Sequence, residues 1–271
     1  MKFIEKLNRI WAKNNSLVCV GLDPDLSKLP ACVRQIKNPI FEFNKAIIDA
    51  TRDDVCCYKP QMACYEGQYA EEDLAMTLAY LRSECPEIPV ILDAKRGDIG
   101  NTSKMYAKEA FERYCADAVT VNPYMGMDAL KPFLDYADRG VVILCRTSNA
   151  GAKEIQELAL ADGTPLYKHV AALIAGPWNY NGNTMLVAGA TAPAELGEIR
   201  KIVGNTPLLV PGIGAQGGDL QGVLKYGLTA EKTGLVINSS RGIIYASSEE
   251  DFAQKAGAEA RKLKEAINAC R

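Results

Sequence analysis

The chain has 271 residues, 48% of them hydrophobic and 24% charged, which is the balance of a globular protein with a substantial core. Its 31 Lys and Arg residues against 33 Asp and Glu residues give a net charge of −2, which excludes a strongly basic footprint for nucleic acid. The one histidine, His169, excludes a metal site of several histidines and leaves a Ser-His-Asp triad possible only through that residue.

The amino-terminal segment, residues 1–15, alternates charged and apolar residues at helical spacing and lacks a signal-peptide core, so it predicts a helix. The longest stretch without charge, 170–194, is broken by glycine, proline and asparagine and cannot span a membrane. The nine cysteines are odd in number and contain no C-x-x-C pair, which indicates thiols in a reducing compartment. We therefore expect a cytoplasmic protein that binds neither nucleic acid nor membrane.

Eight short apolar runs rich in β-branched residues recur along the chain, with helical segments between them. Each run is nearly continuous in hydrophobicity, as is typical of parallel strands buried on both faces. The mean repeat of about 31 residues suits one strand plus one helix. The runs begin near Leu17, Val55, Val90, Ala118, Gly140, Met185, Leu208 and Leu235.

The segments between these runs have the periodicity of amphipathic helices. Ahead of the second run, one buried helix face is predicted to hold Phe41, Ala46, Ile47 and Ala50. The longest interval, 140–185, has room for an extra helix or a mobile loop.

Polar or glycine-rich residues end nearly every predicted strand. Groups that converge from all strand ends are typical of the carboxyl face of a barrel, whereas an open doubly wound sheet gathers its functional groups at one switch point. No linker or low-complexity tract divides the chain. We therefore predict an α/β fold with one domain over residues 1–271: a single (β/α)₈ TIM barrel with an N-terminal helix and an extra helix after the fifth strand.

The most informative segment is ILDAKRGDIGNT, residues 91–102. Strand alternation places Asp93 and Lys95 on one side of the third strand, and Asp98 follows after a glycine turn. In isolation the pattern also fits a solvated charge cluster at a helix N-terminus. However, it directly follows a buried strand, and Lys59 ends an earlier one. Closely spaced opposite charges hold one another ionised and in place, which favours an active site.

A phosphate site is predicted after the last two strands. Four glycines lie within residues 212–218, where they let backbone N–H groups approach an anion, although such a loop also fits an ordinary flexible turn. Arg241 follows the eighth strand. Barrel phosphate sites form after strands seven and eight, and an arginine can grip a phosphate with two parallel hydrogen bonds. The two features together favour a phosphorylated ligand.

The end of the fifth strand, RTSNAG, has two equally weighted interpretations. Ser148 and Asn149 can hydrogen-bond a flat heterocycle or an amide edge, or the segment is an ordinary turn. We interpret His169 as structural, and Trp11 and Trp178 as packing residues.

These segments together resemble the orotidine 5′-phosphate decarboxylase family, in its longer bacterial form (type 2). The resemblance spans strands one to eight. D-x-K-x-x-D in strand three is fairly specific to the superfamily, and its combination with PGIGAQGG is highly specific to this family. The matching segments are VGLDPD with Asp23, YKPQ with Lys59, LDAKRGDIGNT, RTSNAGA, VAGATAP, PGIGAQGG and Ser-Ser-Arg241-Gly.

The resemblance implies decarboxylation of orotidine 5′-phosphate to UMP in de novo pyrimidine biosynthesis without a cofactor. Lys59, Asp93, Lys95 and Asp98 would form an alternating charge network, in which Lys95 protonates C6 of the pyrimidine. No cofactor motif is visible, so preorganised charge would have to lower the barrier.

The resemblance also implies which residues bind substrate. Asp23 and Lys59 would reach the ribose hydroxyls, Ser148 the pyrimidine edge, and Gln216 and Arg241 the phosphate. The implied set also contains Pro211, Gly214 and Gly242.

A homodimer is implied as well, because in relatives the residues that match Asp98, Ile99 and Thr102 enter the partner subunit's site. One position departs from the pattern. The shorter type often has a histidine near the end of strand four, where this chain has Asn122.

Three alternative functions stay open at this point. A metal-dependent sugar-phosphate decarboxylase or aldolase shares D-x-K-x-x-D but holds its metal partly with an acid at the end of strand two, where Lys59 would repel a cation. A non-catalytic nucleotide-binding protein should have lost Lys95 or Asp93, and both are present. A Schiff-base enzyme needs a neutral lysine, which the flanking carboxylates disfavour.

Overall fold

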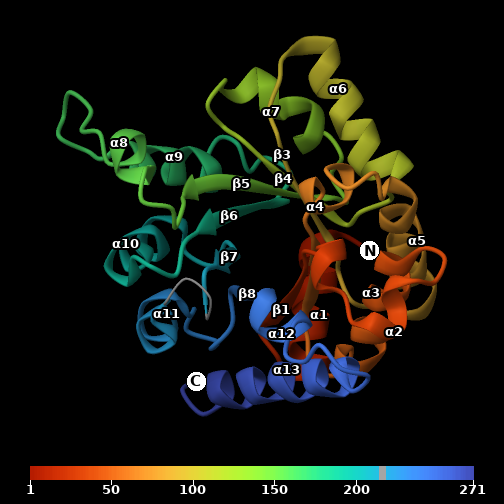
Figure 1. Ribbon diagram of the computed structural model, residues 1–271. Helices are drawn as coiled ribbons and strands as arrows, with labels where there is room; N and C mark the ends of the chain where they lie inside the picture. The colour runs from red at the N-terminus through yellow and green to blue at the C-terminus, as the bar shows by residue number, and fades with distance from the viewer. Residues whose placement is uncertain (214–217) are drawn as a thin grey trace.

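The computed structural model, which describes residues 1–213 and 218–271, has eight parallel strands that curl into a barrel (Figure 1). The hydrogen-bonded order is β2-β1-β8-β7-β6-β5-β4-β3, and the bridges Tyr58–Val90 and Gln61–Asp93 join the two end strands. The predicted (β/α)₈ barrel is confirmed, and each strand begins within two residues of its predicted start. The strands are β1 Val18–Leu22, β2 Cys57–Pro60, β3 Ile91–Arg96, β4 Ala118–Val121, β5 Gly140–Arg146, β6 Thr184–Ala188, β7 Leu208–Pro211 and β8 Leu235–Ser239.

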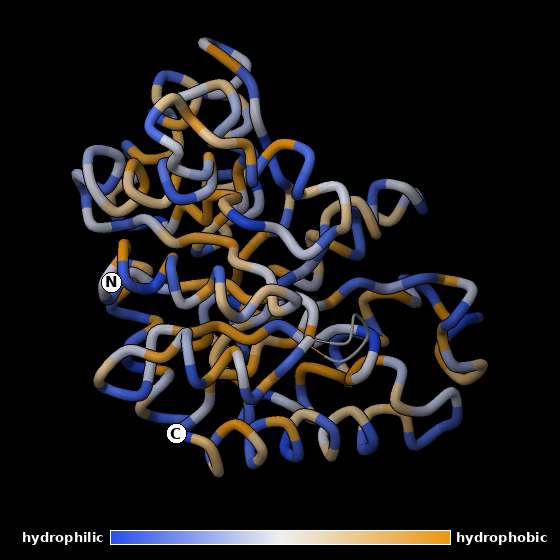
Figure 2. The backbone as a smooth tube through the Cα atoms, turned by 90° about the vertical axis from the view of Figure 1, so that its left-hand side faces the viewer, coloured by the Kyte–Doolittle hydropathy of each residue, from blue (hydrophilic) through white to orange (hydrophobic). Residues whose placement is uncertain are grey.

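The helices surround the strands, and the apolar stretches of the chain run through the middle of the molecule (Figures 1 and 2). The predicted N-terminal helix is α1, and the predicted extra helix after β5 is α8, which precedes α9. The helices are α1 Phe3–Asn14, α2 Ala31–Arg34, α3 Pro39–Thr51, α4 Ala63–Glu66, α5 Glu71–Glu84, α6 Gly100–Lys108, α7 Met127–Leu134, α8 Ala152–Gln156, α9 Leu166–Ala175, α10 Pro193–Val203, α11 Leu220–Gly227, α12 Arg241–Ile244 and α13 Phe252–Asn268, with a 3₁₀ turn at Leu26–Lys28 and a π-helical turn at Glu109–Arg113.

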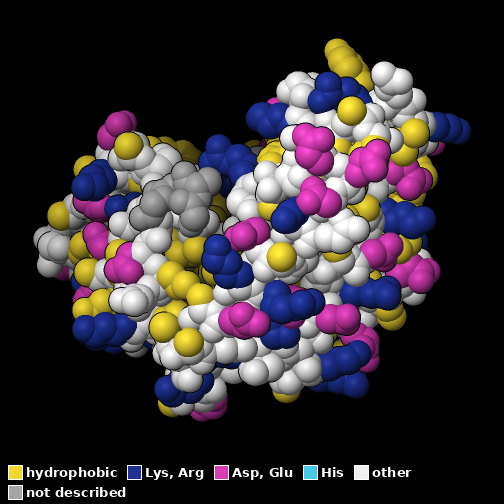
Figure 3. Space-filling view, turned by 60° about the horizontal axis from the view of Figure 1, so that its bottom comes forward, with side chains coloured by type: hydrophobic (Ala, Val, Ile, Leu, Met, Phe, Trp, Pro, Cys, Tyr) yellow, Lys and Arg dark blue, Asp and Glu magenta, His cyan; other side chains and the backbone are white. Residues whose placement is uncertain are grey.

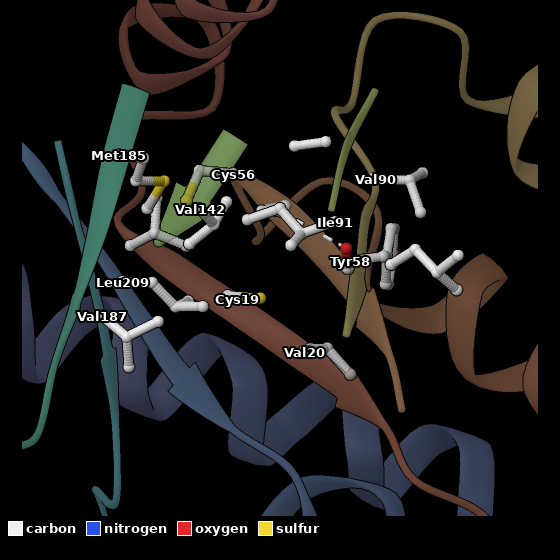
Figure 4. Packing of buried hydrophobic residues seen from close by; sticks show 14 of the residues in the cluster. Cys19, Val20, Cys56, Tyr58, Val90, Ile91, Val142, Met185, Val187 and Leu209 are labelled. Atoms are coloured by element: carbon white, nitrogen blue, oxygen red, sulfur yellow. Dashed lines mark hydrogen bonds between the residues drawn. The ribbon is translucent and has the colours of Figure 1, made fainter. Parts of the chain in front are cut away.

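The barrel interior is filled by apolar side chains. Figure 4 shows Cys19, Val142, Met185 and Leu209 gathered inside the ring of strands, and each of them is at most 2% exposed. Because these strands are buried on their inner and outer faces, their sequences are continuous apolar runs. The prediction that residues 1–271 form one domain stays a prediction, and the shared barrel core supports it.

Helix α1 closes the amino-terminal end of the barrel. Its buried residues include Phe3, whose backbone N–H donates to the carbonyl of Asp138 at 2.9 Å. The Phe3 ring lies on Gly140 at the start of β5, where an added Cβ would meet a ring carbon at 2.3 Å. Only glycine allows this close approach of helix and strand.

The predicted buried face of the helix ahead of β2 is confirmed at Ile47, which is fully buried, but is wrong at its other residues. Phe41 and Ala46 are only half-buried in α3, whereas Ile40 and Phe43 are fully buried. The helix packs against both α5 and α13, so its apolar stripe is set by two neighbours rather than by the strand that follows. Phe41 lies edge-on to Tyr80 at a centroid distance of 6.1 Å.

The surface carries both signs of charge. Lys and Arg side chains are interspersed with Asp and Glu side chains over the face shown in Figure 3, in keeping with the net charge of −2. All nine cysteines are free thiols. Within the described residues, the helices are all too short or too polar to cross a membrane.

Candidate active site

A cavity of about 230 Å³ opens at the carboxyl ends of the strands. Side chains from seven of the eight strands or the loops that follow them face this one space, the arrangement expected of the carboxyl face of a barrel. Its lining residues are Asp23, Lys59, Gln61, Asp93, Lys95, Thr120, Val187, Leu209, Pro211, Gly212, Ile213, Asn238, Ser240 and Arg241.

Asp93 is the centre of the cavity's hydrogen-bond network. Its Oδ1 accepts from Lys95 Nζ at 2.7 Å and from Thr120 Oγ1 at 2.9 Å. Its Oδ2 accepts from Lys59 Nζ at 2.9 Å and from Gln61 Nε2 at 3.1 Å. A carboxylate has about four lone-pair positions, so the hydrogen-bonding capacity of Asp93 is fully used.

The two lysines keep Asp93 ionised although its side chain is only 8% exposed. Burial opposes ionisation most strongly, but the charges and hydrogen bonds of Lys59 and Lys95 outweigh it and hold the pKa of this carboxyl well below its usual range. The carboxylate is therefore a permanent negative charge at neutral pH.

Lys59 is a buried cation between two carboxylates. Its side chain is 4% exposed, and its Nζ lies 3.7 Å from Asp23 Oδ1 as well as 2.9 Å from Asp93 Oδ2. Burial alone would lower the pKa of Lys59, but Asp23 and Asp93 together raise it above its ordinary value. Charges thus alternate in sign along Asp23, Lys59, Asp93 and Lys95.

Lys95 differs from Lys59 in its access to the cavity. Its side chain is 47% exposed, and its Nζ is held on Asp93 Oδ1. A protonated amine in this position can donate a proton to a ligand in the cavity and can stabilise negative charge that develops there.

The opposite wall is formed by the loops after β7 and β8. Pro211 and Arg241 line the cavity, and the guanidinium of Arg241 makes no ion pair or hydrogen bond with another residue in the described ranges. The exposed Arg241 side chain is therefore available to a ligand. Ser240 Oγ, on this wall, is buried without a hydrogen-bond partner among the described residues, and so is Asp23 Oδ1, after β1, although it lies 3.7 Å from Lys59 Nζ. The predicted phosphate residues Gly214 and Gln216 lie outside the described residues.

Other predicted site residues do not line this chain's own cavity. Asp98 is only half-buried, and its Oδ1 accepts from the backbone N–H of Ile99 at 2.8 Å. Ile99 and Thr102 are exposed at the start of α6. Ser148, after β5, and Gly242, in α12, are also absent from the cavity's lining residues.

Sequence reasoning missed four polar lining residues: Gln61, Thr120, Asn238 and Ser240. Gln61 lies two residues after Lys59, so strand alternation could have placed the two side chains on one side. A threonine inside the apolar run of β4 was a weaker signal. Neutral side chains carry no charge pattern, and nothing in the sequence placed Thr120 opposite Asp93.

A second cavity, of about 660 Å³, lies beside α8 and α9 and includes the exposed His169. Its lining contains no Lys or Arg side chain, the permanent cations that commonly bind a phosphate. In the part of the chain that the structure describes, no group of three or more His, Cys, Asp or Glu side chains is arranged to hold a metal ion. The smaller, charged cavity is therefore the candidate active site.

The chain is also similar to known proteins. The sequence model of the "Orotidine 5'-phosphate decarboxylase / HUMPS family" matches residues 16–256. The chain is 54% identical to orotidine 5′-phosphate decarboxylase of Cellvibrio japonicus, with 100% of both chains covered, and 55% identical to that of Dechloromonas aromatica, with 99% of both covered. The solved OMP decarboxylase of Leishmania donovani is similar at a TM-score of 0.84 and 38% identity, covering 100% of this chain and 98% of that one.

Proposed function

The chain belongs to the orotidine 5′-phosphate decarboxylase family, and from that premise we propose how its residues decarboxylate orotidine 5′-phosphate to UMP. The protein is a carboxy-lyase of pyrimidine biosynthesis. The observation that carries the proposed mechanism is the row Asp23, Lys59, Asp93 and Lys95, whose charges alternate along one wall of the cavity.

Lys95 is the proton donor in this mechanism. When the bond between C6 and the carboxyl carbon breaks, CO₂ leaves and the electron pair stays on C6. That pair lies in the ring plane, where the π system of the pyrimidine cannot delocalise it. The Lys95 ammonium stabilises the developing negative charge and then transfers a proton to C6, which leaves the lysine neutral.

Asp93 holds Lys95 in place and acts on the leaving group by charge. Its four hydrogen bonds fix the carboxylate, so it cannot move away from a ligand carboxylate bound next to it. Two adjacent negative charges raise the energy of bound substrate, and this repulsion is relieved as CO₂ departs. The loss of charge at the leaving group therefore favours the forward reaction.

The remaining polar groups bind the rest of the nucleotide. We assign Asp23, whose Oδ1 makes no hydrogen bond with the described residues, and its ion-pair partner Lys59 to the ribose hydroxyls, and the guanidinium of Arg241 to the phosphate. Binding energy from the phosphate, which is remote from C6, holds the pyrimidine against Lys95. Pro211 borders the same region. Ser148, Gly214, Gln216 and Gly242 stay part of the proposed substrate-binding set.

Replacing Arg241 by alanine should weaken substrate binding by about 2–3 kcal/mol, because a charge-assisted contact to phosphate is lost. This corresponds to a fall in kcat/KM of about 30- to 150-fold. Steady-state kinetics measure the effect. Arg241→Lys, which keeps the charge but not the two-pronged geometry, should fall between the wild type and the alanine variant. An unchanged KM and kcat/KM in Arg241→Ala would refute the phosphate assignment.

We propose that the reaction needs no cofactor or metal. The support comes from Lys59, whose cation lies 2.9 Å from Asp93 and occupies the position from which a metal-dependent relative would coordinate its ion. Loss of orotidine 5′-phosphate absorbance should therefore proceed at an unchanged rate after exhaustive treatment of the protein with EDTA. A rate that falls on chelation and returns with a divalent cation would favour the metal-dependent alternative.

We also propose a homodimer in which Asp98, Ile99 and Thr102 enter the partner subunit's site. In support, Ile99 is an apolar side chain that is 57% exposed, and Asp98 does not line the cavity of its own chain. A cytoplasmic location is part of the proposal, supported by nine free cysteines that a reducing compartment preserves.

Mixing two inactive variants tests the shared site. Lys95→Ala and Asp98→Ala should each lack activity, yet co-expression should restore about a quarter of wild-type activity, because half of the dimers are mixed and each has one intact site. Differently tagged chains allow the mixed dimer to be purified. Activity no greater than that of the two variants alone would show that Asp98 acts within its own chain.

A further inference from the structure

The hydroxyl of Thr120 lies between the two charged groups at the centre of the active site. Thr120 belongs to β4, and its side chain is buried, with the residue 1% exposed. Its Oγ1 accepts from the backbone N–H of Lys95 at 2.9 Å and donates to Asp93 Oδ1 at 2.9 Å. A single hydroxyl thus contacts the proposed proton donor and the carboxylate that holds it.

An irregularity in β3 creates this contact. Leu92 pairs with Val119 and Arg96 with Val121, so the three residues 93–95 of β3 lie opposite Thr120 alone. Extra residues in a bulge lose their ladder partners, and Lys95 has the left-handed φ of +47°, which is unfavourable for a residue with a Cβ. The hydroxyl of Thr120 supplies the hydrogen-bond partner that the neighbouring backbone does not.

The resulting hydrogen bonds form a closed ring through Lys95. The backbone N–H of Lys95 donates to Thr120 Oγ1, and the Thr120 hydroxyl donates to Asp93 Oδ1. The Nζ of Lys95 donates to the same Asp93 oxygen at 2.7 Å and closes the ring. Because the hydroxyl has one proton, accepting from Lys95 directs that proton toward Asp93. Both ends of Lys95 are therefore fixed relative to one carboxylate oxygen.

We propose that Thr120 is a positioning residue, whose hydroxyl holds the strained backbone of Lys95 and one oxygen of Asp93 so that the ammonium meets C6. Gln61 provides a contrast, because it donates to the other oxygen of Asp93 but makes no hydrogen bond with Lys95. This inference rests on the proposed role of Lys95 as proton donor.

Thr120→Val tests the inference, because valine keeps the shape and removes the hydroxyl. We expect kcat to fall about 10- to 100-fold, since displacement of a reacting group by about 1 Å can cost that much. The KM and the dissociation constant of UMP should change less than about threefold, because Thr120 is remote from Arg241, to which we assign the phosphate. Thr120→Ser restores the hydroxyl and should return kcat to within about threefold of wild type.

Thr77→Val is the matched control. Thr77 is also a fully buried threonine whose hydroxyl both donates, to the carbonyl of Asp73 at 2.7 Å, and accepts, from Asn44 at 3.1 Å. It lies in α5, away from the cavity, so its loss should lower the unfolding temperature and leave kcat unchanged. If Thr120→Val does not fold, Thr120→Cys replaces it, because a thiol is a weaker donor and acceptor and should lower kcat less severely.

A kcat within twofold of wild type in Thr120→Val, or in Thr120→Cys where that variant is used, would overturn the inference. Equal losses in Thr120→Ser and Thr120→Val would overturn it too, as would a loss of UMP affinity as large as the loss of kcat. Lys95→Ala, assayed in parallel, distinguishes failure of the positioning role of Thr120 from failure of the proposed mechanism. Near-normal turnover by that variant defeats the proposed role of Lys95 as proton donor, whereas a normal kcat in Thr120→Val alone defeats only the positioning role.

Discussion

Lys95→Ala is expected to lower kcat at least about 10⁴-fold while UMP still binds with near-normal affinity. The variant loses both general-acid catalysis and the fixed positive charge at C6, which typically contribute about 10²–10⁴-fold and 10²–10³-fold. Nucleotide affinity should survive because the proposed ribose and phosphate contacts come from other strands, at Asp23 and Arg241. Turnover by absorbance and UMP binding by calorimetry measure the two effects separately.

Lys255→Ala is the control for this variant. Lys255 is an exposed lysine on α13 with only a 3.9 Å ion pair to Asp251, so its removal should change neither measurement. A kcat in Lys95→Ala within tenfold of wild type would contradict the assignment of Lys95 as proton donor. Loss of UMP binding in proportion to kcat would show instead that Lys95 serves binding.

Asp93→Asn is expected to abolish turnover and to lower the free energy of unfolding at pH 7 by about 3–5 kcal/mol, the cost of leaving a buried charge without its partner. Lys59 would then have Asp23 as its one remaining carboxylate partner, with 3.7 Å between Lys59 Nζ and Asp23 Oδ1. In either orientation, the asparagine amide would also point its N–H₂ group at a lysine that can only donate. Denaturant unfolding and the kinetic assay measure the two effects. Asp135→Asn, which disrupts an exposed pair with Lys131, should cost less than about 1 kcal/mol.

The stability difference between wild type and Asp93→Asn should depend on pH in a defined direction. The pKa of Asp93 is lowered in the folded state, so its contribution is complete above the unfolded value of about 3.9 and is lost as pH falls below it. Unfolding curves should therefore show a constant difference from pH 5 to 7 that shrinks toward pH 3. A difference that grows on acidification would contradict the charge assignment.

The strands could be predicted well because a barrel strand is buried on both faces and leaves a continuous apolar run. The prediction of which face of α3 is buried was largely wrong, because that face depends on packing against α5 and α13, and the local sequence pattern does not contain this information. Asp93 and Lys95 do share one cavity, as alternation predicts. However, the two side chains are brought together by a bulge in β3 and by the left-handed backbone conformation of Lys95, and neither feature is visible in the sequence.

Charged site residues were easier to find than neutral ones. Asp23, Lys59 and Arg241 follow strand ends and are conspicuous in an otherwise apolar setting, and all three line the cavity. Thr120 was missed because its importance arises from its register opposite β3, a relation between strands separated by a helix. Asp98 belongs to the same motif as Lys95, but it does not line the cavity of its own chain, and its expected place in the partner subunit's site stays a prediction.

The full set of hydrogen bonds at Asp93 has a consequence for ligand selectivity and inhibitor design. With both oxygens engaged by four protein donors, this carboxylate has no acceptor position left for a ligand N–H or O–H. In the proposed mechanism, Asp93 therefore acts on a substituent at pyrimidine C6 by charge and size rather than by hydrogen bonding. Under the proposed mechanism, nucleotide analogues with a compact neutral C6 group avoid both the repulsion that an anionic group meets at Asp93 and the repulsion that a cationic group meets at Lys95.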